Sequence, residues 1–154
     1  MNTESRFPQV DQSAIKVSQG SMVTLLVVAF VFDVWPLVLV VAILNTLGVI
    51  SPNLDLTRHL YFRVLGPLGW VEPNVMPDHP EPHRFAKGVG AVLAAVAALF
   101  LGLGVTTVGW ILVWVLMLLA LLNLVVGFCL GCFFYYQFNR LGVPGFNHRP
   151  LEAE

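Results

Sequence analysis

The chain has 154 residues, of which 57% are hydrophobic and 11% are charged, and its formal net charge is −1. Soluble proteins carry about 25% charged residues, so this composition excludes an ordinary soluble domain and favours one compact domain in a lipid bilayer. A net charge this low argues against nucleic-acid binding, which needs a clustered basic face. The two cysteines exclude a disulfide-rich scaffold.

The first apolar block, residues 22–50, follows a polar N-terminal stretch without a signal-peptide pattern. It is either one long kinked helix or a hairpin bent between Asp33 and Pro36. In the single helix, Asp33 would lie near the bilayer centre at a cost of about 2.5–3.5 kcal/mol. In the hairpin, Asp33 reaches water and can cap the next helix, with Pro36 in its first turn.

The central segment, residues 51–84, is the main exposed part of the chain. Leu54–Leu65 has apolar and basic positions suited to a helix in the membrane interface. The stretch that follows is too rich in proline for regular structure, so it is predicted to be an extended cytoplasmic loop. His79 and His83 lie in this stretch and are predicted to be solvated loop residues.

The second apolar block is longer, because Gly88 to Asn139 contains no Asp, Glu, Lys or Arg. A span of the hydrocarbon core needs about 20 apolar residues, so this block predicts two membrane helices separated by a turn rich in glycine and threonine. In the first of the two helices, small residues recur at four-residue spacing, which lets a neighbouring helix approach closely. They are Gly90, Ala94, Ala98 and Gly102.

The basic residues decide between the two interpretations of the first block. All eight lie in the N-terminal tail, the central segment or the C-terminal tail, and neither proposed turn carries one. With four spans they all fall on one side of the membrane, which the positive-inside rule assigns to the cytoplasm. We therefore predict four spans, with both termini cytoplasmic.

The predicted fold is an all-α integral membrane protein of four transmembrane helices, arranged as two pseudo-repeated helical hairpins with an interfacial segment after each. A cytoplasmic tail (1–13) precedes the first hairpin, whose helices span 14–32 and 34–50. A cytoplasmic interfacial segment (51–84) leads to the second hairpin, whose helices span 85–104 and 108–128. The cysteine pair and a second cytoplasmic tail follow at 129–154. The repeat rests on the likeness of Ala42–Asn45 to Ala120–Asn123. Asn45 and Asn123 either form interhelical hydrogen bonds, the favoured use, or line a substrate path.

Cys129 and Cys132 form a C-x-x-C pair near the predicted cytoplasmic boundary, where a permanent disulfide is not expected. One interpretation is a dithiol for redox or sulfur transfer. A position at a helix C-terminus argues against it, since reactive pairs sit at helix N-termini that lower the thiol pKa. Gly127 and Gly131 could break the helix and start another, which would weaken this objection.

Two other interpretations of the cysteine pair stay open. It could be half of a metal site, completed by His59, His79, His83 or His148 or by a second copy of the chain. No histidine has ligand spacing tied to the cysteines, so we assign no metal and no cofactor. The pair could also be two small residues packed at a helix end.

The motifs Glu81-Pro82-His83-Arg84-Phe85-Ala86 and Cys129-Leu130-Gly131-Cys132, the latter followed by an aromatic run, carry a family resemblance. Over most of its length the chain resembles an uncharacterised bacterial integral-membrane family, a domain of unknown function (DUF4395). Members of that family occur beside, or fused to, thioredoxin-like and rhodanese-like proteins. The resemblance therefore implies thiol or sulfur handling, and a protein of either kind as a partner.

These observations predict a multi-pass protein of the bacterial inner membrane that performs thiol–disulfide or sulfur-transfer chemistry at the cytoplasmic face. Cys132 would be the more exposed thiol, Cys129 its resolving partner and Arg140 a thiolate-stabilising charge. One alternative is a small transporter or channel for a sulfur compound, with Asn45 and Asn123 along its path. Another is a non-catalytic anchor or assembly subunit. Catalysis itself and assembly into a homo-oligomer are left open.

Overall fold

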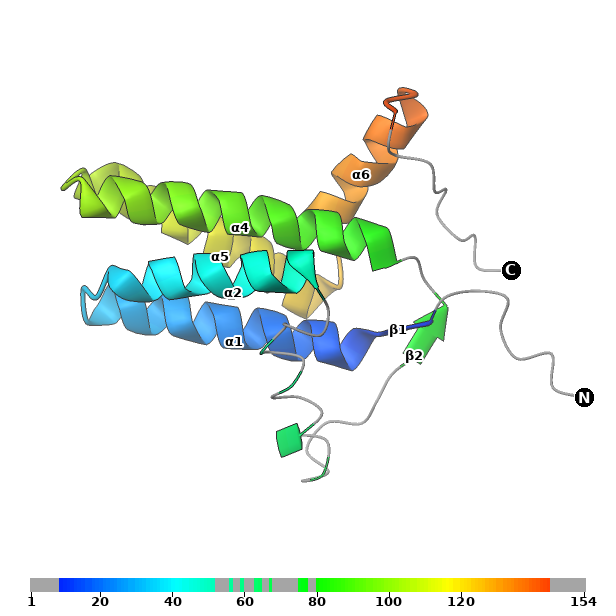
Figure 1. Ribbon diagram of the computed structural model, residues 1–154, viewed down its shortest axis with the longest axis horizontal. Helices are drawn as coiled ribbons and strands as arrows, with labels where there is room; N and C mark the ends of the chain where they lie inside the picture. Colours follow the sequence, from blue (N-terminus) through cyan, green and yellow to red (C-terminus); the bar gives the residue numbers. More distant parts are fainter. Residues whose placement is uncertain are drawn as a thin grey trace, which may run out of the picture.

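The computed structural model describes residues 9–51, 75–77 and 80–144, together with positions 56, 59, 63, 64 and 67. The elements in chain order are β1 (Gln9–Asp11), α1 (Gln12–Val31), α2 (Pro36–Ile50), β2 (Val75–Pro77), α4 (Pro80–Gly102), α5 (Thr106–Val126) and α6 (Leu130–Arg140). The helices α1, α2, α4 and α5 lie side by side as two antiparallel hairpins, and both hairpin turns are at the same end (Figure 1). At the opposite end, α6 leaves the bundle at an angle.

The first apolar block is a hairpin and not one kinked helix. Helix α1 ends at Val31 and α2 begins at Pro36, which occupies the first turn as predicted. Asp33 lies in the turn with a left-handed φ of 54°, a conformation that Asp tolerates better than most residues. The prediction that Asp33 caps α2 is wrong, because the N-cap residue is Trp35 and no side chain caps this end.

The second hairpin turns at Gly104, whose φ of 82° suits a residue without a Cβ. Its first helix, α4, begins at Pro80, within the stretch that was predicted to be irregular. Proline is tolerated in the first helical turn because the N–H that it lacks would have no partner there. Because α4 begins this early, His83 is a helical residue.

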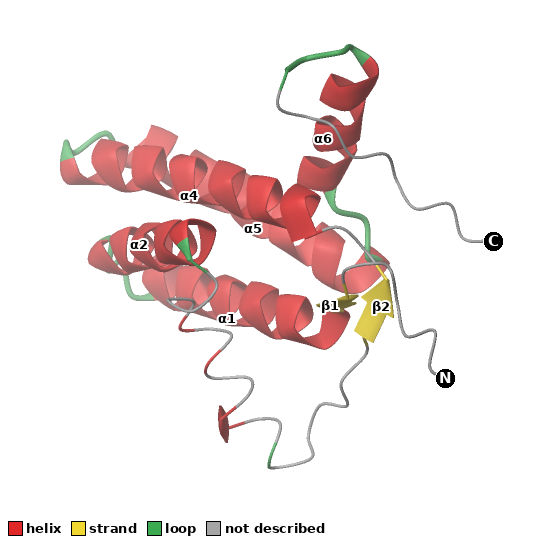
Figure 2. Cartoon of the chain, turned by 45° about the vertical axis from the view of Figure 1, so that its right-hand side comes forward, coloured by secondary structure: helices red, strands yellow, loops and turns green. Residues whose placement is uncertain are grey.

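The proline-rich stretch also contributes a short strand that the sequence did not predict. β1 pairs antiparallel with β2, with Val10 opposite Met76 (Figure 2). The last residue of β1, Asp11, caps α1 by accepting a hydrogen bond from the backbone N–H of Ser13 at 2.9 Å. The two-stranded sheet of β1 and β2 therefore links the start of α1 to the segment before α4. Predictions for residues 1–8, most of 52–74, His79, and residues 145–154 including His148, lie outside the described residues.

The bundle core is built from small and branched apolar side chains near the hairpin turns. Ala94 and Ala97 on α4 are fully buried, as are Leu26, Val38 and Val113 on the three neighbouring helices. Large apolar side chains point outward instead, among them Val27, Phe30, Leu39, Ile43, Val92, Leu99, Ile111, Leu118 and Val125. Small residues inside and large apolar residues outside are the arrangement of helices that pack in lipid.

Three of the helices, α1, α4 and α5, are long and apolar enough to cross a membrane. The apolar helix α2 has 15 residues and is shorter than the usual span. The protein thus has the helices of a membrane protein, with the shorter α2 packed between α1 and α4.

Candidate functional site

The C-x-x-C pair lies where α5 ends and α6 begins. Gly127 ends α5 in the left-handed conformation with φ of 72°, and α6 starts at Leu130 after a short turn. Cys129 is the N-cap residue of α6, and its Sγ accepts a hydrogen bond from the backbone N–H of Cys132 at 3.3 Å. The pair therefore sits at a helix N-terminus, and the objection based on a helix C-terminus does not hold.

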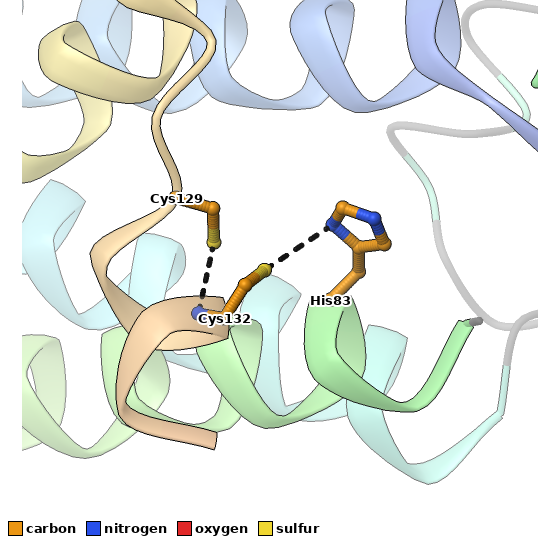
Figure 3. Close-up of side chains that lie close together, drawn as sticks. All are labelled: His83, Cys129 and Cys132. Carbon is orange, nitrogen blue, oxygen red and sulfur yellow. Dashed lines mark hydrogen bonds between the residues drawn. The ribbon is translucent and has the colours of Figure 1, made fainter. Parts of the chain in front are cut away.

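His83 is the third member of this site, although it lies 49 positions before Cys132. The first turn of α4 carries it toward the start of α6, and its Nδ1 lies 3.6 Å from the Sγ of Cys132 (Figure 3). All three side chains are half-buried. The prediction that His83 is a solvated loop residue is wrong, because Pro80 and Pro82 begin the helix instead of preventing it.

Contacts between α4 and α6 hold the cluster together. The Tyr135 hydroxyl donates a hydrogen bond to the Glu81 carboxylate at 3.0 Å. The Phe85 ring packs against the rings of Tyr135 and Phe138, with centroid distances of 5.9 and 6.5 Å. Burial raises the pKa of Tyr135 most strongly, and the neighbouring Glu81 carboxylate raises it further. The Tyr135 hydroxyl therefore stays protonated and donates the hydrogen bond.

The two helices approach each other closely at Gly131, between the cysteines. A Cβ at this position would lie 2.5 Å from the Cβ and 2.7 Å from the Cα of Ala86, so only glycine fits. Ala86 follows His83 by three residues and lies on the same side of α4. The glycine inside the C-x-G-C motif thus allows the start of α6 to reach His83.

The environment of Cys129 favours the thiolate. Hydrogen bonding by the Cys132 side chain lowers the pKa of Cys129 most strongly, and His83 and the Cys132 backbone N–H lower it further. Burial opposes them, and the resulting pKa is about 5 against an ordinary value of 9.0. Within the described part of the chain, Cys129 and Cys132 are not joined in a disulfide.

A cavity of about 320 Å³ opens beside the cluster and is bounded by all four bundle helices. His83, Cys129 and Gly131 line one end, and Leu116, near the middle of α5, lines the other. Lys87, one turn after His83 on α4, adds a positive charge to the wall, and its Nζ lies 3.5 Å from the Ser18 Oγ. The volume suits a small molecule.

Asn45 and Asn123, predicted from matching positions in the two halves, both line this cavity. Asn45 is buried and its amide Nδ2 contacts the Met22 sulfur at 3.3 Å, which is an interhelical hydrogen bond between α2 and α1. Gln19 also lines the cavity, and its buried Oε1 has no hydrogen-bond partner among the described residues. The cavity wall therefore offers amide groups to a polar ligand.

Arg140, predicted to stabilise a thiolate, is exposed in the last turn of α6. At 1.5 Å per residue it lies about 12 Å along the helix from Cys132, so α6 separates its charge from the sulfurs. The sequence offered His83 only as one of four histidines that could complete a metal site, and it predicted a loop at this position. Asp78 ahead of Pro80-Glu81 is the pattern typical of a helix start, and it could have placed His83 on a helix.

The cluster has the donor atoms for two kinds of chemistry. Two adjacent sulfurs, one of them a stabilised thiolate, can exchange disulfides. The same sulfurs with an imidazole can also ligate a thiophilic metal ion, because the ligand atoms of His83, Cys129 and Cys132 all lie within 4.8 Å of one another.

Comparison with known proteins places this architecture in a family. No curated protein and no solved structure matches the chain. Residues 10–140 match the family described as a domain of unknown function, DUF4395, and the matched region reaches from β1 to the last residue of α6. It includes His83, Cys129 and Cys132. The chain therefore belongs to the DUF4395 family.

Proposed function

We propose that this chain is a four-span protein of the bacterial inner membrane that carries out thiol–disulfide exchange or sulfur transfer through Cys129 and Cys132 at the cytoplasmic face. The observation that carries the proposal is the placement of the pair at the start of α6. Both sulfurs lie near His83, and Cys129 also lines the wall of a cavity.

Four spans are supported by the antiparallel packing of α2 between α1 and α4. At 1.5 Å per residue, the 15 residues of α2 extend about 22 Å. This is shorter than a hydrocarbon core of about 30 Å, and local thinning of the bilayer accommodates such a difference. The two pseudo-repeated hairpins then enter and leave the membrane on the same side.

The orientation is supported by the charges at the two ends of the bundle. The turns at 32–35 and 103–105 carry no Lys or Arg, whereas Lys16, Arg84 and Arg140 lie toward the other end. The positive-inside rule assigns the end with the basic residues to the cytoplasm. Cys129 and Cys132 lie at this end and would therefore face the cytoplasm.

In the proposed reaction, the Cys129 thiolate attacks one sulfur of a substrate disulfide that enters the cavity. A mixed disulfide forms between Cys129 and that sulfur, and the other half of the substrate leaves as a thiolate. This assigns the attack to Cys129, whereas the sequence assigned it to Cys132. The reassignment follows from the N-cap position of Cys129 and from its place in the cavity wall.

Cys132 completes the exchange. It gives its proton to the nearby His83 and attacks the Cys129 sulfur, which forms the intramolecular disulfide and releases the second substrate thiolate. The substrate disulfide gains two electrons and the dithiol loses them. A thioredoxin-like partner in the cytoplasm would return the pair to the dithiol by the reverse exchange.

The cavity favours this function over transport of a sulfur compound. Its walls extend from Cys129 to Leu116, near the middle of α5, while the part of the bundle next to the turns is filled by residues such as Leu26 and Val113. A pocket that does not extend into this packed part of the bundle suits a ligand that reacts and leaves on the same side. Asn45, Asn123 and Lys87 would then orient a polar or anionic sulfur compound.

The test is to trap the mixed disulfide. The variant Cys132→Ser should accumulate a reducible adduct on Cys129 in native membranes, seen by mass spectrometry after acid quenching, because no thiol remains to release it. The matched variant Cys129→Ser lacks the attacking thiol and should accumulate much less. Equal adduct levels in the two variants, or none in Cys132→Ser, would overturn the proposed exchange.

A further inference from the structure

The fold brings together three soft ligand atoms that are far apart in the sequence. The sulfurs of Cys129 and Cys132 come from the start of α6, and the imidazole of His83 comes from the first turn of α4 (Figure 3). The three ligand atoms lie within 4.8 Å of one another. Two thiolates and an imidazole select thiophilic ions such as Zn²⁺ over Mg²⁺ or Ca²⁺, which prefer oxygen ligands.

The spacing matches that of two ligands on one tetrahedral zinc ion. Zn–S bonds of about 2.3 Å and Zn–N bonds of about 2.0–2.1 Å, at the tetrahedral angle, place the sulfur and nitrogen about 3.6 Å apart. The Cys132 Sγ lies 3.6 Å from the His83 Nδ1. An ion could therefore bind between these two atoms with little movement of either helix.

We propose that His83, Cys129 and Cys132 form a three-ligand zinc site whose fourth position faces the cavity. Both cysteines bind the ion as thiolates, so Cys132 gives up its proton on binding, and the imidazole coordinates through Nδ1. Because His83 and Cys129 both line the cavity, a water molecule or an incoming thiolate can complete the tetrahedron from that side. An open fourth position is the arrangement of reactive zinc sites, in contrast to closed structural ones.

The surrounding contacts support such a site. The Cys132 backbone N–H donates to the Cys129 sulfur, which stabilises this ligand as a thiolate. The Tyr135–Glu81 hydrogen bond and the close approach of Gly131 to Ala86 hold α4 and α6 at the spacing that the three ligands need. A disulfide between the cysteines would remove two ligands, so zinc would bind only the reduced protein.

Spectroscopic titration with Co²⁺, a probe for tetrahedral zinc sites, tests the proposal on the full-length protein in detergent micelles. The reduced, chelator-treated protein should bind one Co²⁺ with thiolate-to-cobalt charge-transfer absorption and tetrahedral visible bands, and Zn²⁺ should displace it. His83→Ala should weaken Co²⁺ binding by at least about 100-fold, since even the loss of an outer-shell partner costs roughly 10–100-fold. The matched variant His59→Ala, at an exposed position, should bind as the wild type does.

A second variant separates loss of a ligand from loss of the fold. His83→Cys supplies a third sulfur and should restore tetrahedral binding with stronger charge-transfer absorption. Unchanged binding in His83→Ala, octahedral bands without charge transfer, or no rescue by His83→Cys would overturn the proposal. Trapping of a mixed disulfide in Cys132→Ser requires no metal, so the zinc site and the disulfide exchange can fail independently.

Discussion

Replacing Gly131 with alanine tests whether the close approach of α6 to α4 builds the cluster. The added Cβ would lie 2.5 Å from the Cβ and 2.7 Å from the Cα of Ala86, whereas carbon atoms in contact lie about 3.5–4.0 Å apart. One of the opposing atoms belongs to the backbone, so no side-chain rotation relieves the clash. The helices must separate by about 1 Å at this point.

Two consequences follow from this separation. Overpacking of this kind costs about 1–3 kcal/mol, so the free energy of unfolding should fall by that amount. If the shift carries over to the next residue, it lengthens the 3.6 Å distance between Cys132 and His83 to about 4.6 Å. The two atoms then have to move closer again before one tetrahedral zinc ion can bind both, so Co²⁺ affinity should fall at least about tenfold.

The assay combines thermal unfolding in micelles, followed by tryptophan fluorescence, with the Co²⁺ titration. Gly20→Ala is the matched control, because a Cβ there meets nothing within 4 Å and alanine is a better helix former. Adding Ala86→Gly to Gly131→Ala removes one of the two clashing atoms and should recover part of the loss. If Gly131→Ala behaves like Gly20→Ala in both measurements, the inferred contact between α4 and α6 is wrong.

Three further predictions concern other parts of the chain. In metal-free protein, the alkylation rate of Cys129 should stay constant from about pH 6 to pH 8 and fall below about pH 5. The reason is that the lowered pKa keeps Cys129 ionised as a thiolate until the pH approaches 5. A tenfold rise in rate per pH unit up to pH 8 would contradict this. Gly109→Ala should cost about 1–3 kcal/mol in thermal unfolding, since its Cβ would lie 2.5 Å from the Leu101 Cγ, and an unchanged melting temperature would count against that packing. Tyr135→Phe should cost about 1 kcal/mol and speed proteolysis of α6, because it removes the hydrogen bond to Glu81; cleavage at the wild-type rate would show that this bond does not hold α6.

The bundle helices and their turns could be predicted because local chemistry specifies them. Apolar segments have to become helices in lipid, and Asp33, Pro36 and Gly104 lie where the two turns occur. The end of α5 was harder, because Gly127 is compatible both with continuing helix and with a left-handed cap. Only the structure shows that it ends the helix and puts Cys129 at the start of the next.

The site could be predicted only in part, because its third member depends on tertiary packing. No spacing rule relates His83 to cysteines 46 and 49 positions later in the sequence. Proline also has two opposite meanings, since it breaks a helix interior but starts a helix well. In the first sense, Pro80 and Pro82 predict a loop at His83, and nothing then favours His83 over the other three histidines as a partner of the cysteines. The cavity likewise depends on how four helices pack, which apolar periodicity does not specify.

The proposed chemistry requires the cysteines and the hairpin turns to lie on opposite sides of the membrane. A membrane-impermeant maleimide, applied to spheroplasts and to inverted vesicles, measures this directly. In the wild type, Cys129 and Cys132 should be labelled only in inverted vesicles. In a background without these cysteines, Val34→Cys and Leu103→Cys, one in each exposed turn, should be labelled only in spheroplasts. Labelling of Cys129 or Cys132 from outside, or of the two turns from opposite sides, would contradict four spans with the reactive pair in the cytoplasm.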